Sequence, residues 1–587
     1  MIREEIKNLI KEALKNLGIE EIDFNLEHPA DLKMGDYSTN VAMVLSKKLG
    51  RNPKELAEQL RSVLTRSPQL RSVLTRSPQL RSVLTRSPQS EMIAGIFRVE
   101  VAGPGFINFY LSKDFFADIL NKILKEKENF GWKEIKNKEK TIVEYTDPNP
   151  FKEFHIGHLM SNTAGESISR IVEANGSEVK RACYQGDVGM HVAKAVWGYL
   201  KQKDWKTSYA YGAKAYDTDE NSKKEIEEIN KKIYLKDKEI MPLYEEGRKI
   251  SLEAFEKIYK KLGTKFDFYF FESETAELGQ KIVLENTDKV FEKGDNGAIV
   301  FHAEKFNKKL HTRVFINSIG LPTYEAKELG LAKIKYDKYQ YDRSIVITGN
   351  EINDYFKVLL EAMKNVFPEL ASKTLHFSHG MLRLPSGKMS SRTGDVITAE
   401  SLLSAISEKV IDKVRETNRG EMSDDFINQV SVAALKYSIL KQSVGADVIY
   451  DFEKSISFEG DSGPYLQYSY ARAKSILEKA KESGITENFD HTLNEIFENM
   501  EDGISEVERL IYRFPEIVEK SGNEFAPHHI ANYLIELARS FNAYYGNTKI
   551  VDREDPSSSY KVALTRAFSI VMKNGLYLLG IEAPEKM

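Results

Sequence analysis

The sequence predicts an α/β domain with a parallel sheet, preceded by an α+β region and followed by an all-α helical bundle. A chain of 587 residues is too long for one hydrophobic core, so about three domains are expected. Residues 1–112 mix helices with short strands, and residues 113–400 alternate between strand and helix patterns, which is typical of a parallel sheet. Helical periodicity dominates residues 401–587.

The composition excludes several classes of protein. Hydrophobic residues make up 41% of the chain and charged residues 29%, which is ordinary for a globular protein. The stretch Met1–Gly18 has a charged, amphipathic helix pattern instead of a secretory signal, and no later stretch is apolar enough to span a bilayer. Cys183 is the single cysteine, which excludes an internal disulfide and any zinc site that needs two thiolates. We therefore expect a cytoplasmic protein without a membrane partner.

The most informative segment joins a predicted strand to a predicted helix. The apolar run Thr141–Tyr145 predicts the strand, and the pattern from His158 to Ala174 predicts a helix that ends at Asn175 and Gly176. A loop between a strand and a helix N-terminus binds anions well, because free backbone N–H groups and the helix dipole face the ligand. The segment therefore predicts a phosphate site.

Two histidines and a distant lysine fit such a site. His155 and His158 are three residues apart, so both imidazoles can reach one phosphate chain, and Gly157 lets a flat base approach the backbone. Lys388 lies in the glycine-containing loop Leu384–Gly394, which can close on a ligand as a mobile clamp. Each residue alone has a structural alternative, a buried histidine or a surface lysine. The combination favours nucleotide binding.

The two motifs resemble the ATP signatures of class I aminoacyl-tRNA synthetases, and their surroundings resemble arginyl-tRNA synthetases. Further segments match that family in its order along the chain: Gly35–Asn40, Gly103–Asn108, Gly186–Gly189, Asp461–Tyr468 and Leu579–Met587. The resemblance implies a Rossmann-like class I synthetase catalytic domain with insertions at residues 113–400. It also implies an N-terminal tRNA-body-binding domain at residues 1–112 and an anticodon-binding bundle at residues 401–587.

The resemblance also implies a reaction in two steps. Arginine and ATP, bound with Mg²⁺ as Mg·ATP, would give arginyl-adenylate and pyrophosphate. The arginyl group would then pass to the 3′-terminal adenosine of tRNA(Arg). We expect a monomer with no protein-bound metal. The net charge of −4 is compatible with a tRNA partner, because phosphate contacts depend on local lysine and arginine clusters.

The family's ATP residues carry over to eight positions of this chain: Pro148, Asn149, His155, Gly157, His158, Lys388, Met389 and Ser390. The chain departs from the class pattern at Ser391, where a lysine usually contributes to the transition state. Arginyl enzymes commonly lack this lysine, and a lysine just before the histidine motif is thought to replace it. Lys152 occupies that place, so the predicted catalytic residues are Lys152, His155, His158 and Lys388. Arg392 is the alternative, although a guanidinium is not equivalent to an ammonium.

A guanidinium substrate needs carboxylates and planar acceptors around it, because an unpaired buried cation is very costly. The residues that match the family's arginine pocket are Glu144, Asn149, Tyr324, Glu328 and Glu351. Tyr324 and Glu328 share one helix face at four-residue spacing, and many relatives have aspartate in place of Glu328. Glu351 stands where glutamine is frequent. It either binds the α-amino group of the substrate or is a loop carboxylate, and both interpretations remain open.

Other polar residues near these motifs have two interpretations. Asp187 and His191 either line the same cleft or cap the local structure. Unpaired bases stack on aromatic and arginine planes, so the resemblance assigns tRNA binding to a cluster at the start of the C-terminal bundle. The members of this cluster are Tyr465, Tyr468, Tyr470 and Arg472. Their spacing alone would favour core tyrosines.

Two other functions compete with the synthetase assignment. A small-molecule nucleotidyltransferase could share the strand–loop–helix unit, but it would have no use for the helical C-terminal third. A non-catalytic tRNA-binding paralogue would keep that third but would be expected to lose His155, His158 or Lys388. All three residues are present, which favours the enzyme.

A tandem repeat interrupts the N-terminal region. The segment Gln59–Pro68 recurs without change at residues 69–78 and 79–88. Its arginines are Arg61, Arg66, Arg71, Arg76, Arg81 and Arg86, and it contains no acidic residue. It is either an RNA-contacting arm or a tolerated surface insertion. Because the prolines interrupt any long helix and loops accept insertions cheaply, we favour the insertion.

Deleting Gln69–Pro88 should leave thermal stability and aminoacylation intact, because each repeat unit can form only a short helical turn before its proline. Losing four arginines should raise the KM for tRNA modestly, and this rise should shrink as salt is added. Thermal melting and tRNA titrations at two salt concentrations measure both effects. A large fall in melting temperature, or a loss of tRNA affinity that resists salt, would contradict the insertion.

Overall fold

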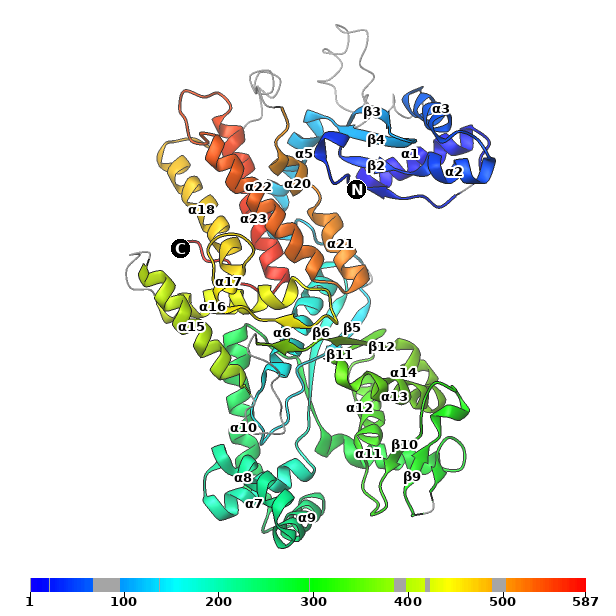
Figure 1. The fold of residues 1–587 in the computed structure, drawn as a ribbon, viewed down its shortest axis with the longest axis vertical. Coiled ribbons are helices and arrows are strands. Elements are labelled where there is room, and N and C mark those ends of the chain that lie inside the picture. Colours follow the sequence, from blue (N-terminus) through cyan, green and yellow to red (C-terminus); the bar gives the residue numbers. More distant parts are fainter. Residues whose placement is uncertain are drawn as a thin grey trace. The chain divides into compact units, whose positions relative to one another are not determined.

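The computed structural model describes residues 2–20, 22–66, 95–136, 138–294, 296–384, 397–416, 423–487 and 503–587 (Figure 1). The described chain forms two compact units. The first contains residues 1–130, 473–514 and 539–571, and the second contains residues 131–472, 515–538 and 572–587. Most of the repeat, from residue 67 onward, and the lysine loop at 385–396 lie outside the described residues.

A five-stranded parallel sheet organises the second unit. Its order is β12-β11-β5-β6-β7. The strands are β5 (Lys140–Glu144), β6 (Glu178–Gln185), β7 (Phe268–Phe271), β11 (Arg343–Gly349) and β12 (Thr374–His379). The chain builds β6 and β7 on one side of β5 and later adds β11 and β12 on the other. The direction of winding therefore reverses between β5 and β11, which confirms the predicted α/β class.

Helix α6 (Ile156–Ala174) follows β5 and is buried along almost its whole length. Its carboxylate Glu166 accepts a hydrogen bond from the Tyr145 hydroxyl at 2.5 Å and from Arg170 Nε at 2.7 Å, and Arg181 Nε lies 3.2 Å away. A buried carboxylate persists because these donors replace water. Asn175 and Gly176 end the helix as the sequence predicts.

Two insertions separate the strands of the parallel sheet. Between β6 and β7 stand α7 (Met190–Gln202), α8 (Trp205–Thr218), α9 (Glu220–Tyr234) and α10 (Met241–Leu262). Helices α7, α8 and α9 pack together (Figure 1). Their buried side chains form a hydrophobic core that is mainly aliphatic and includes Trp197. Between β7 and β11 stand α11 (Glu272–Glu285), a small antiparallel sheet and α12 (Tyr324–Lys338). The small sheet contains β8 (Glu292–Lys293), β9 (Ile299–Phe301) and β10 (Arg313–Ile316).

Helical elements complete the second unit. Helices α13 (Asn353–Val366) and α14 (Pro368–Lys373) connect β11 to β12. After the short strand β13 (Leu382–Arg383) come α15 (Ala399–Glu416), α16 (Asp424–Leu440), β14 (Val448–Ile449) and α17 (Phe452–Ser455). Helices α18 (Gly463–Glu482), α21 (Phe514–Glu524), α22 (His528–Asn547) and α23 (Ser558–Leu578) each contribute part of their length. The predicted helical C-terminal region is thus present.

The first unit combines an antiparallel sheet with helices from both ends of the chain. The sheet order is β1-β2-β4-β3, with β1 (Leu26–Glu27), β2 (Tyr37–Thr39), β3 (Ile96–Ala102) and β4 (Phe106–Leu111). Its N-terminal helices are α1 (Ile2–Asn16), α2 (Val41–Leu49), α3 (Pro53–Arg66) and α5 (Lys113–Glu126), and α3 includes the first repeat residues Gln59–Arg66. Tyr512, just after α20 (Glu506–Ile511), belongs to the same core.

A buried ion pair joins the two sequence-distant parts of the first unit. Asp36 is fully buried, accepts the Leu111 N–H at 2.8 Å, and contacts Arg509 Nη1 at 2.6 Å. The domain boundary predicted at residue 112 does not include this contact, because Arg509 lies far along the chain. Within the described residues, no helix is long and apolar enough to cross a membrane.

Replacing Asp36 with alanine should destabilise the first unit, because Arg509 and the Leu111 N–H would lose a buried partner. The free energy of unfolding should fall by about 3 kcal/mol, as for other broken buried ion pairs. Asp36→Asn keeps an acceptor for the Leu111 N–H and should lose less. Denaturation followed by circular dichroism compares these variants with the exposed control Asp23→Ala. Equal stability of Asp36→Ala and Asp23→Ala would contradict the argument.

Candidate active site

The predicted ATP and arginine residues that the structure describes gather mainly at the C-terminal edge of the parallel sheet. Strand β5 ends at Glu144 and β11 ends at Gly349, and these neighbouring strands flank the point where the winding reverses. Open α/β sheets bind ligands at this point, because the loops that leave the two strands diverge and open a crevice. The β5–α6 loop carries Asn149, Lys152 and His155, and the β11–α13 connection carries Glu351.

His155 and His158 hold the start of α6 in a reciprocal cap. His155 Nδ1 accepts the Gly157 N–H at 3.1 Å, and His158 Nδ1 accepts the His155 N–H at 3.2 Å. The two rings stack with their centroids 3.7 Å apart. Since Nδ1 accepts in both rings, each neutral imidazole carries its proton on Nε2. The pair therefore presents two N–H donors from a helix N-terminus, which suits a phosphate chain.

The electrostatic surroundings keep both histidines neutral. Burial, reinforced by Lys152, lowers the pKa of His155, while Glu351 opposes this shift. Burial lowers the pKa of His158 well below its usual range, with further contributions from His155, Lys152 and His379. Both rings are thus hydrogen-bond donors rather than cations at neutral pH, and the positive charge near the phosphates must come from other groups.

The β5–α6 loop holds an unfavourable backbone conformation. Thr146 and Asp147 have φ of 82° and 46°, in the left-handed region that residues with a side chain rarely adopt. Ser161 Oγ accepts the Thr146 N–H at 2.8 Å and donates to the carbonyl of Ile347 in β11 at 3.1 Å. Asn162 Nδ2 donates to Thr146 Oγ1 at 3.0 Å. Helix α6 therefore fixes the strained turn and ties it to β11.

Two glycines make room for side chains of the site. A Cβ on Gly157 would lie 2.9 Å from the His155 ring, so the glycine permits the reciprocal cap as well as close approach of a base. A Cβ on Gly186 would lie 2.2 Å from Asn149 Oδ1 and 3.1 Å from Glu272 Oε1. Asn149 and Glu272 thus meet over Gly186, the first residue after β6. Either glycine-to-alanine change would displace site residues.

Lys152 lies close to the histidine cap. Its ammonium stands over the ring of Tyr209, on α8, at 5.3 Å from the ring centroid. Burial and the nearby Lys194 lower the pKa of Lys152, while Glu272 opposes this shift. The ammonium also contributes to the lowered pKa of both histidines of the cap. Lys152 is therefore a cation beside the histidine donors.

The arginine carboxylates predicted from the sequence differ in their surroundings. Glu144 is 2% exposed, and its Oε2 accepts a hydrogen bond from Lys335 Nζ, on α12, at 2.8 Å. Lys335 thus holds Glu144 in an internal ion pair. Sequence reasoning missed Lys335, although it follows Glu328 by seven residues and so shares its helix face.

Two other carboxylates keep part of their surface open. Asp147 follows β5 and Glu328 lies on α12, and both are only partly covered. Asp147 Oδ1 accepts the Tyr184 N–H at 2.7 Å. Burial and then repulsion from Glu144 raise the pKa of Asp147 well above its usual range, and the same two causes raise the pKa of Glu328 to about 8. Such crowding of acidic groups is suited to binding a cation.

The remaining predicted arginine residues lie at the margins of this pocket. Tyr324, the first residue of α12, is 58% exposed, and Lys327 Nζ lies 5.2 Å from its ring centroid. Glu351 folds back over the end of β11, where a Cβ on Gly349 would lie 2.2 Å from its Oε2. Its charge opposes the lowered pKa of His155, so Glu351 faces the histidine side of the site.

Asp187 and His191 make structural contacts. Asp187 is fully buried and accepts hydrogen bonds from the Ser273 N–H and Oγ, the Tyr244 hydroxyl and Arg248 Nε, all within 3.0 Å. His191 Nε2 lies 2.7 Å from the Gly186 carbonyl and donates to it. Burial lowers the pKa of His191 to about 3, so the ring stays neutral. These contacts favour the capping interpretation of both residues.

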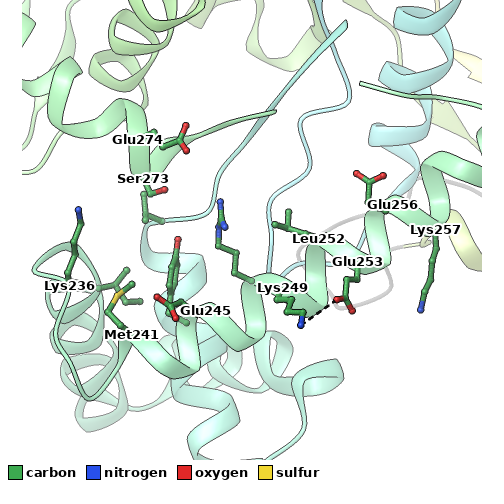
Figure 2. Close-up of a pocket in the computed structure, with 14 residues that line it drawn as sticks. Lys236, Met241, Glu245, Lys249, Leu252, Glu253, Glu256, Lys257, Ser273 and Glu274 are labelled. Atoms are coloured by element: carbon green, nitrogen blue, oxygen red, sulfur yellow. Dashed lines mark ion pairs between the residues drawn. The ribbon is translucent and has the colours of Figure 1, made fainter. Parts of the chain in front are cut away.

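A separate cavity of about 810 Å³ lies between α10 and the start of α11 (Figure 2). Lys249 and Glu253 form an ion pair along its α10 wall, and Ser273 and Glu274 border it from α11. None of the predicted ATP or arginine residues that the structure describes lines it. Its connection to the site is indirect, because Ser273 also holds Asp187.

The described chain stops at residue 384 and resumes at residue 397, beside the histidine cap. Lys388, Met389, Ser390, Ser391 and Arg392 lie outside the described residues. The segment just after the loop forms an antiparallel bridge between His155 and Thr398. Around this bridge, the Ile156 N–H donates to the Ile397 carbonyl at 3.3 Å and the Ala399 N–H to the Phe154 carbonyl at 2.7 Å. Residues 397–399 are thus anchored beside the histidine cap.

The predicted tRNA cluster lies on α18, and its members differ in how exposed their side chains are. Arg472 stands over the Tyr468 ring at 4.7 Å and donates from Nη2 to its hydroxyl at 3.1 Å. Tyr465, Tyr468 and Arg472 are partly exposed. Tyr470 is 2% exposed and lies in the core, the alternative that spacing alone favours. Tyr470 is two residues from both Tyr468 and Arg472, about half a helix turn, so it lies on the opposite face of α18.

Sequence reasoning also missed a buried ion pair next to Asn149. Lys327 Nζ, on α12, lies 2.6 Å from Glu272 Oε2, and both side chains are nearly covered. Glu272 directly follows the apolar strand β7, and a polar residue at the end of a parallel strand is a usable signal for a site. Lys327 lies between Tyr324 and Glu328 in the sequence, but its partner could not be predicted from the sequence.

Family models match almost the whole chain. The model of the tRNA synthetases class I (R) catalytic domain matches residues 119–452. The model of the arginyl tRNA synthetase N-terminal domain matches residues 4–78, and that of the DALR anticodon binding domain matches residues 466–587.

Full-length relatives agree with these models. The arginine–tRNA ligase of Treponema denticola is 33% identical over 83% of this chain and 85% of its own length. The arginine–tRNA ligase of Fusobacterium nucleatum is 32% identical over 94% of this chain and 93% of its own length. The structure of Thermus thermophilus arginyl-tRNA synthetase matches the fold with a TM-score of 0.77 at 23% identity over 100% of both chains. The chain therefore belongs to the class I arginyl-tRNA synthetase family.

Proposed function

We propose that this chain is an arginine–tRNA ligase whose active site is the crevice at the ends of β5 and β11. The proposal rests on one observation, which is that hydrogen-bond donors and carboxylates lie at the same edge of the sheet. Neutral histidine donors cap α6, while β5 supplies the buried carboxylate of Glu144 and α12 the partly covered carboxylate of Glu328. The donors suit the phosphates of ATP, and the carboxylates suit a guanidinium.

At the ATP end, His155 and His158 donate from Nε2 to the phosphates, and the free N–H groups of α6 add to this field. Pro148, Asn149 and Gly157 shape the pocket, and Lys388, Met389 and Ser390 close over it from the lysine loop. Mg²⁺ enters with ATP as Mg·ATP. A carboxylate oxygen of arginine attacks the α-phosphorus, forming a new P–O bond, while pyrophosphate leaves.

At the arginine end, the guanidinium lies against Glu328, while Glu144 contributes negative charge from its pair with Lys335. Asn149 and Tyr324 orient the substrate, and Glu351 faces its α-amino group. A guanidinium requires several acceptors, because each unpaired N–H in a dry pocket costs free energy. This requirement selects arginine over lysine or citrulline.

In the second step, the terminal ribose hydroxyl of tRNA(Arg) attacks the carbonyl of the adenylate and AMP leaves. Tyr465, Tyr468 and Arg472 bind unpaired tRNA bases from α18, where Arg472 already stacks on Tyr468. We propose a cytoplasmic monomer with domains at residues 1–112, 113–400 and 401–587. A nucleotidyltransferase would leave the DALR-matching region without a role, so the ligase is favoured.

ATP–pyrophosphate exchange should depend on arginine and should appear only when the matching tRNA is added. We expect the arginine dependence because carboxylates gather at the proposed amino-acid site. We expect the tRNA dependence because the family usually needs tRNA in the first step. The assay measures exchange with each of the twenty amino acids, with and without bulk tRNA. Equal exchange with another amino acid would refute the assignment, and full exchange without tRNA would refute the mechanism.

Lys152→Ala should lower kcat by about 100-fold, as expected for loss of one preorganised charge, with little change in the KM for arginine. The reason is that Lys152 stands beside the histidine cap and replaces the lysine that is absent at Ser391. Adding Ser391→Lys to this variant should restore part of the rate. Steady-state aminoacylation kinetics provide the measurement, with Arg392→Ala as the comparison. Near-normal activity of Lys152→Ala and collapse of Arg392→Ala would assign the role to Arg392 instead.

A further inference from the structure

A buried lysine joins the C-terminal ends of two helices. Lys436, on α16, is fully buried, and its Nζ donates to the carbonyls of Leu262 and Gly580, each at 2.7 Å. Leu262 is the last residue of α10, and Gly580 follows the end of α23. The last carbonyls of a helix have no N–H partner within the helix, so a donor with positive charge is favourable there. We call this contact of Lys436 with Leu262 and Gly580 the helix-end junction.

Arg170 of α6 reinforces the junction from a second side. It donates to the carbonyl of Gly263, just after α10, at 3.2 Å and to the carbonyl of Tyr577, in α23, at 2.9 Å. Burial and then Arg170 lower the pKa of Lys436 to about 7. A lysine that has lost its proton keeps two N–H groups, so both contacts to carbonyls persist on either side of this pKa.

Helix α10 leads from the junction to the β5–α6 loop. Figure 1 shows α10 between α16 and α7, and it contacts both helices. Ser251 Oγ, on α10, accepts the Phe151 N–H at 2.9 Å, and a Cβ on Gly247 would lie 2.5 Å from the Phe151 ring. Phe151 has φ of 70°, in the left-handed region. Because such strain persists only where surrounding contacts fix it, α10 holds Phe151 in this conformation.

The strained residue directly precedes the proposed catalytic cation, Lys152. Ser251 and Leu262 lie 11 residues apart on α10, which corresponds to about 16 Å along the helix axis. A helix is rigid over this length, so a shift of its C-terminal end would also move Ser251 and the backbone of Phe151. Small displacements of a catalytic group cost much of the rate, because the reaction depends on its orientation.

We propose that Lys436 is a positioning residue for the activation step, because it fixes α10 and α10 fixes the strained backbone before Lys152. The inference rests on the proposed function and adds to it a residue that touches no substrate. Loss of the junction would let α10 shift along its axis and would displace Lys152 from the histidine cap. The proposed arginine pocket lies on β5 and α12, so arginine binding would change little.

Hydrogen exchange followed by mass spectrometry tests the junction without a substrate. In full-length Lys436→Met, which keeps a long side chain but loses the donor, residues 148–154 should exchange about tenfold faster, because the Phe151 N–H loses its fixed acceptor. Gly580→Ala is a second variant, since its Cβ would lie 2.8 Å from Lys436 Nζ. Its matched control is Gly484→Ala, which also follows a helix and has a similar φ, but whose Cβ would meet no described atom within 4 Å. Only Gly580→Ala should accelerate exchange at residues 148–154.

Kinetics test the role in activation. With the matching tRNA present, Lys436→Met and Gly580→Ala should each lower the kcat of arginine-dependent ATP–pyrophosphate exchange by about tenfold, with the KM for arginine within about twofold of wild type. Adding Lys436→Met to Lys152→Ala should lower kcat no further, because Lys436 acts through Lys152. A general loss of structure would instead multiply the two effects.

A second pair of variants tests the step from α10 to the loop. Ser251→Ala removes the acceptor of the Phe151 N–H and should reproduce the faster exchange and the lower kcat. Its matched control is Ser438→Ala on α16, a buried serine that donates to the Ala434 carbonyl and does not contact the loop. This control should behave as the wild type.

The outcomes separate this inference from the proposed function. Unchanged hydrogen exchange at residues 148–154 in Gly580→Ala would overturn the inference, even if Lys436→Met does not fold. Equal effects of Gly580→Ala and Gly484→Ala would also overturn it, as would effects on kcat that multiply with Lys152→Ala. If the wild-type protein shows no arginine-dependent exchange of pyrophosphate, the proposed function fails and the positioning role fails with it, even where hydrogen exchange confirms the junction.

Discussion

The turn at Thr146 and Asp147 is the constraint on which the rest of the crevice depends. Two consecutive residues with side chains stand in the left-handed region, and Ser161 and Asn162 of α6 hold them there. This turn sends the chain from the end of β5 towards the α6 N-terminus, while it directs the Asp147 carboxylate to the other side. Local strain of this kind persists only when surrounding contacts fix it, and it is typical of functional sites.

The same turn separates two electrostatic environments within one crevice. On the α6 side, burial keeps His155 and His158 neutral, so they attract phosphate as donors without adding to the repulsion on Lys152. On the other side, Glu144 and its neighbours create a negative field that Lys335 only partly balances. In the proposed site, a substrate with a cationic side chain and an anionic carboxylate would therefore be aligned with that carboxylate towards the ATP phosphates.

The sequence predicted what local patterns determine. The α/β class, β5, α6 and its end at Asn175 follow from periodicity, chain direction and turn chemistry within a few residues. The partners of the site carboxylates could not be predicted, because Lys335 lies 191 residues from Glu144 and the contact depends on how α12 packs on the sheet. Tyr470 lies in the core, the alternative that its spacing alone favours, but which face of α18 is covered depends on packing that the sequence does not show.

Helix α6 connects the crevice to the end of the chain within the second unit. Ser167 Oγ donates to the Leu578 carbonyl at 2.8 Å, and Arg170 Nη1 donates to that of Tyr577 at 2.9 Å. Lys436 Nζ, fully buried, donates to the carbonyls of Leu262 and Gly580 at 2.7 Å. The helix that positions the histidine cap is therefore fixed by β11 at its start and by the end of α23 along its length. Because these contacts are direct and buried, the geometry of the cap depends on residues that no ligand touches.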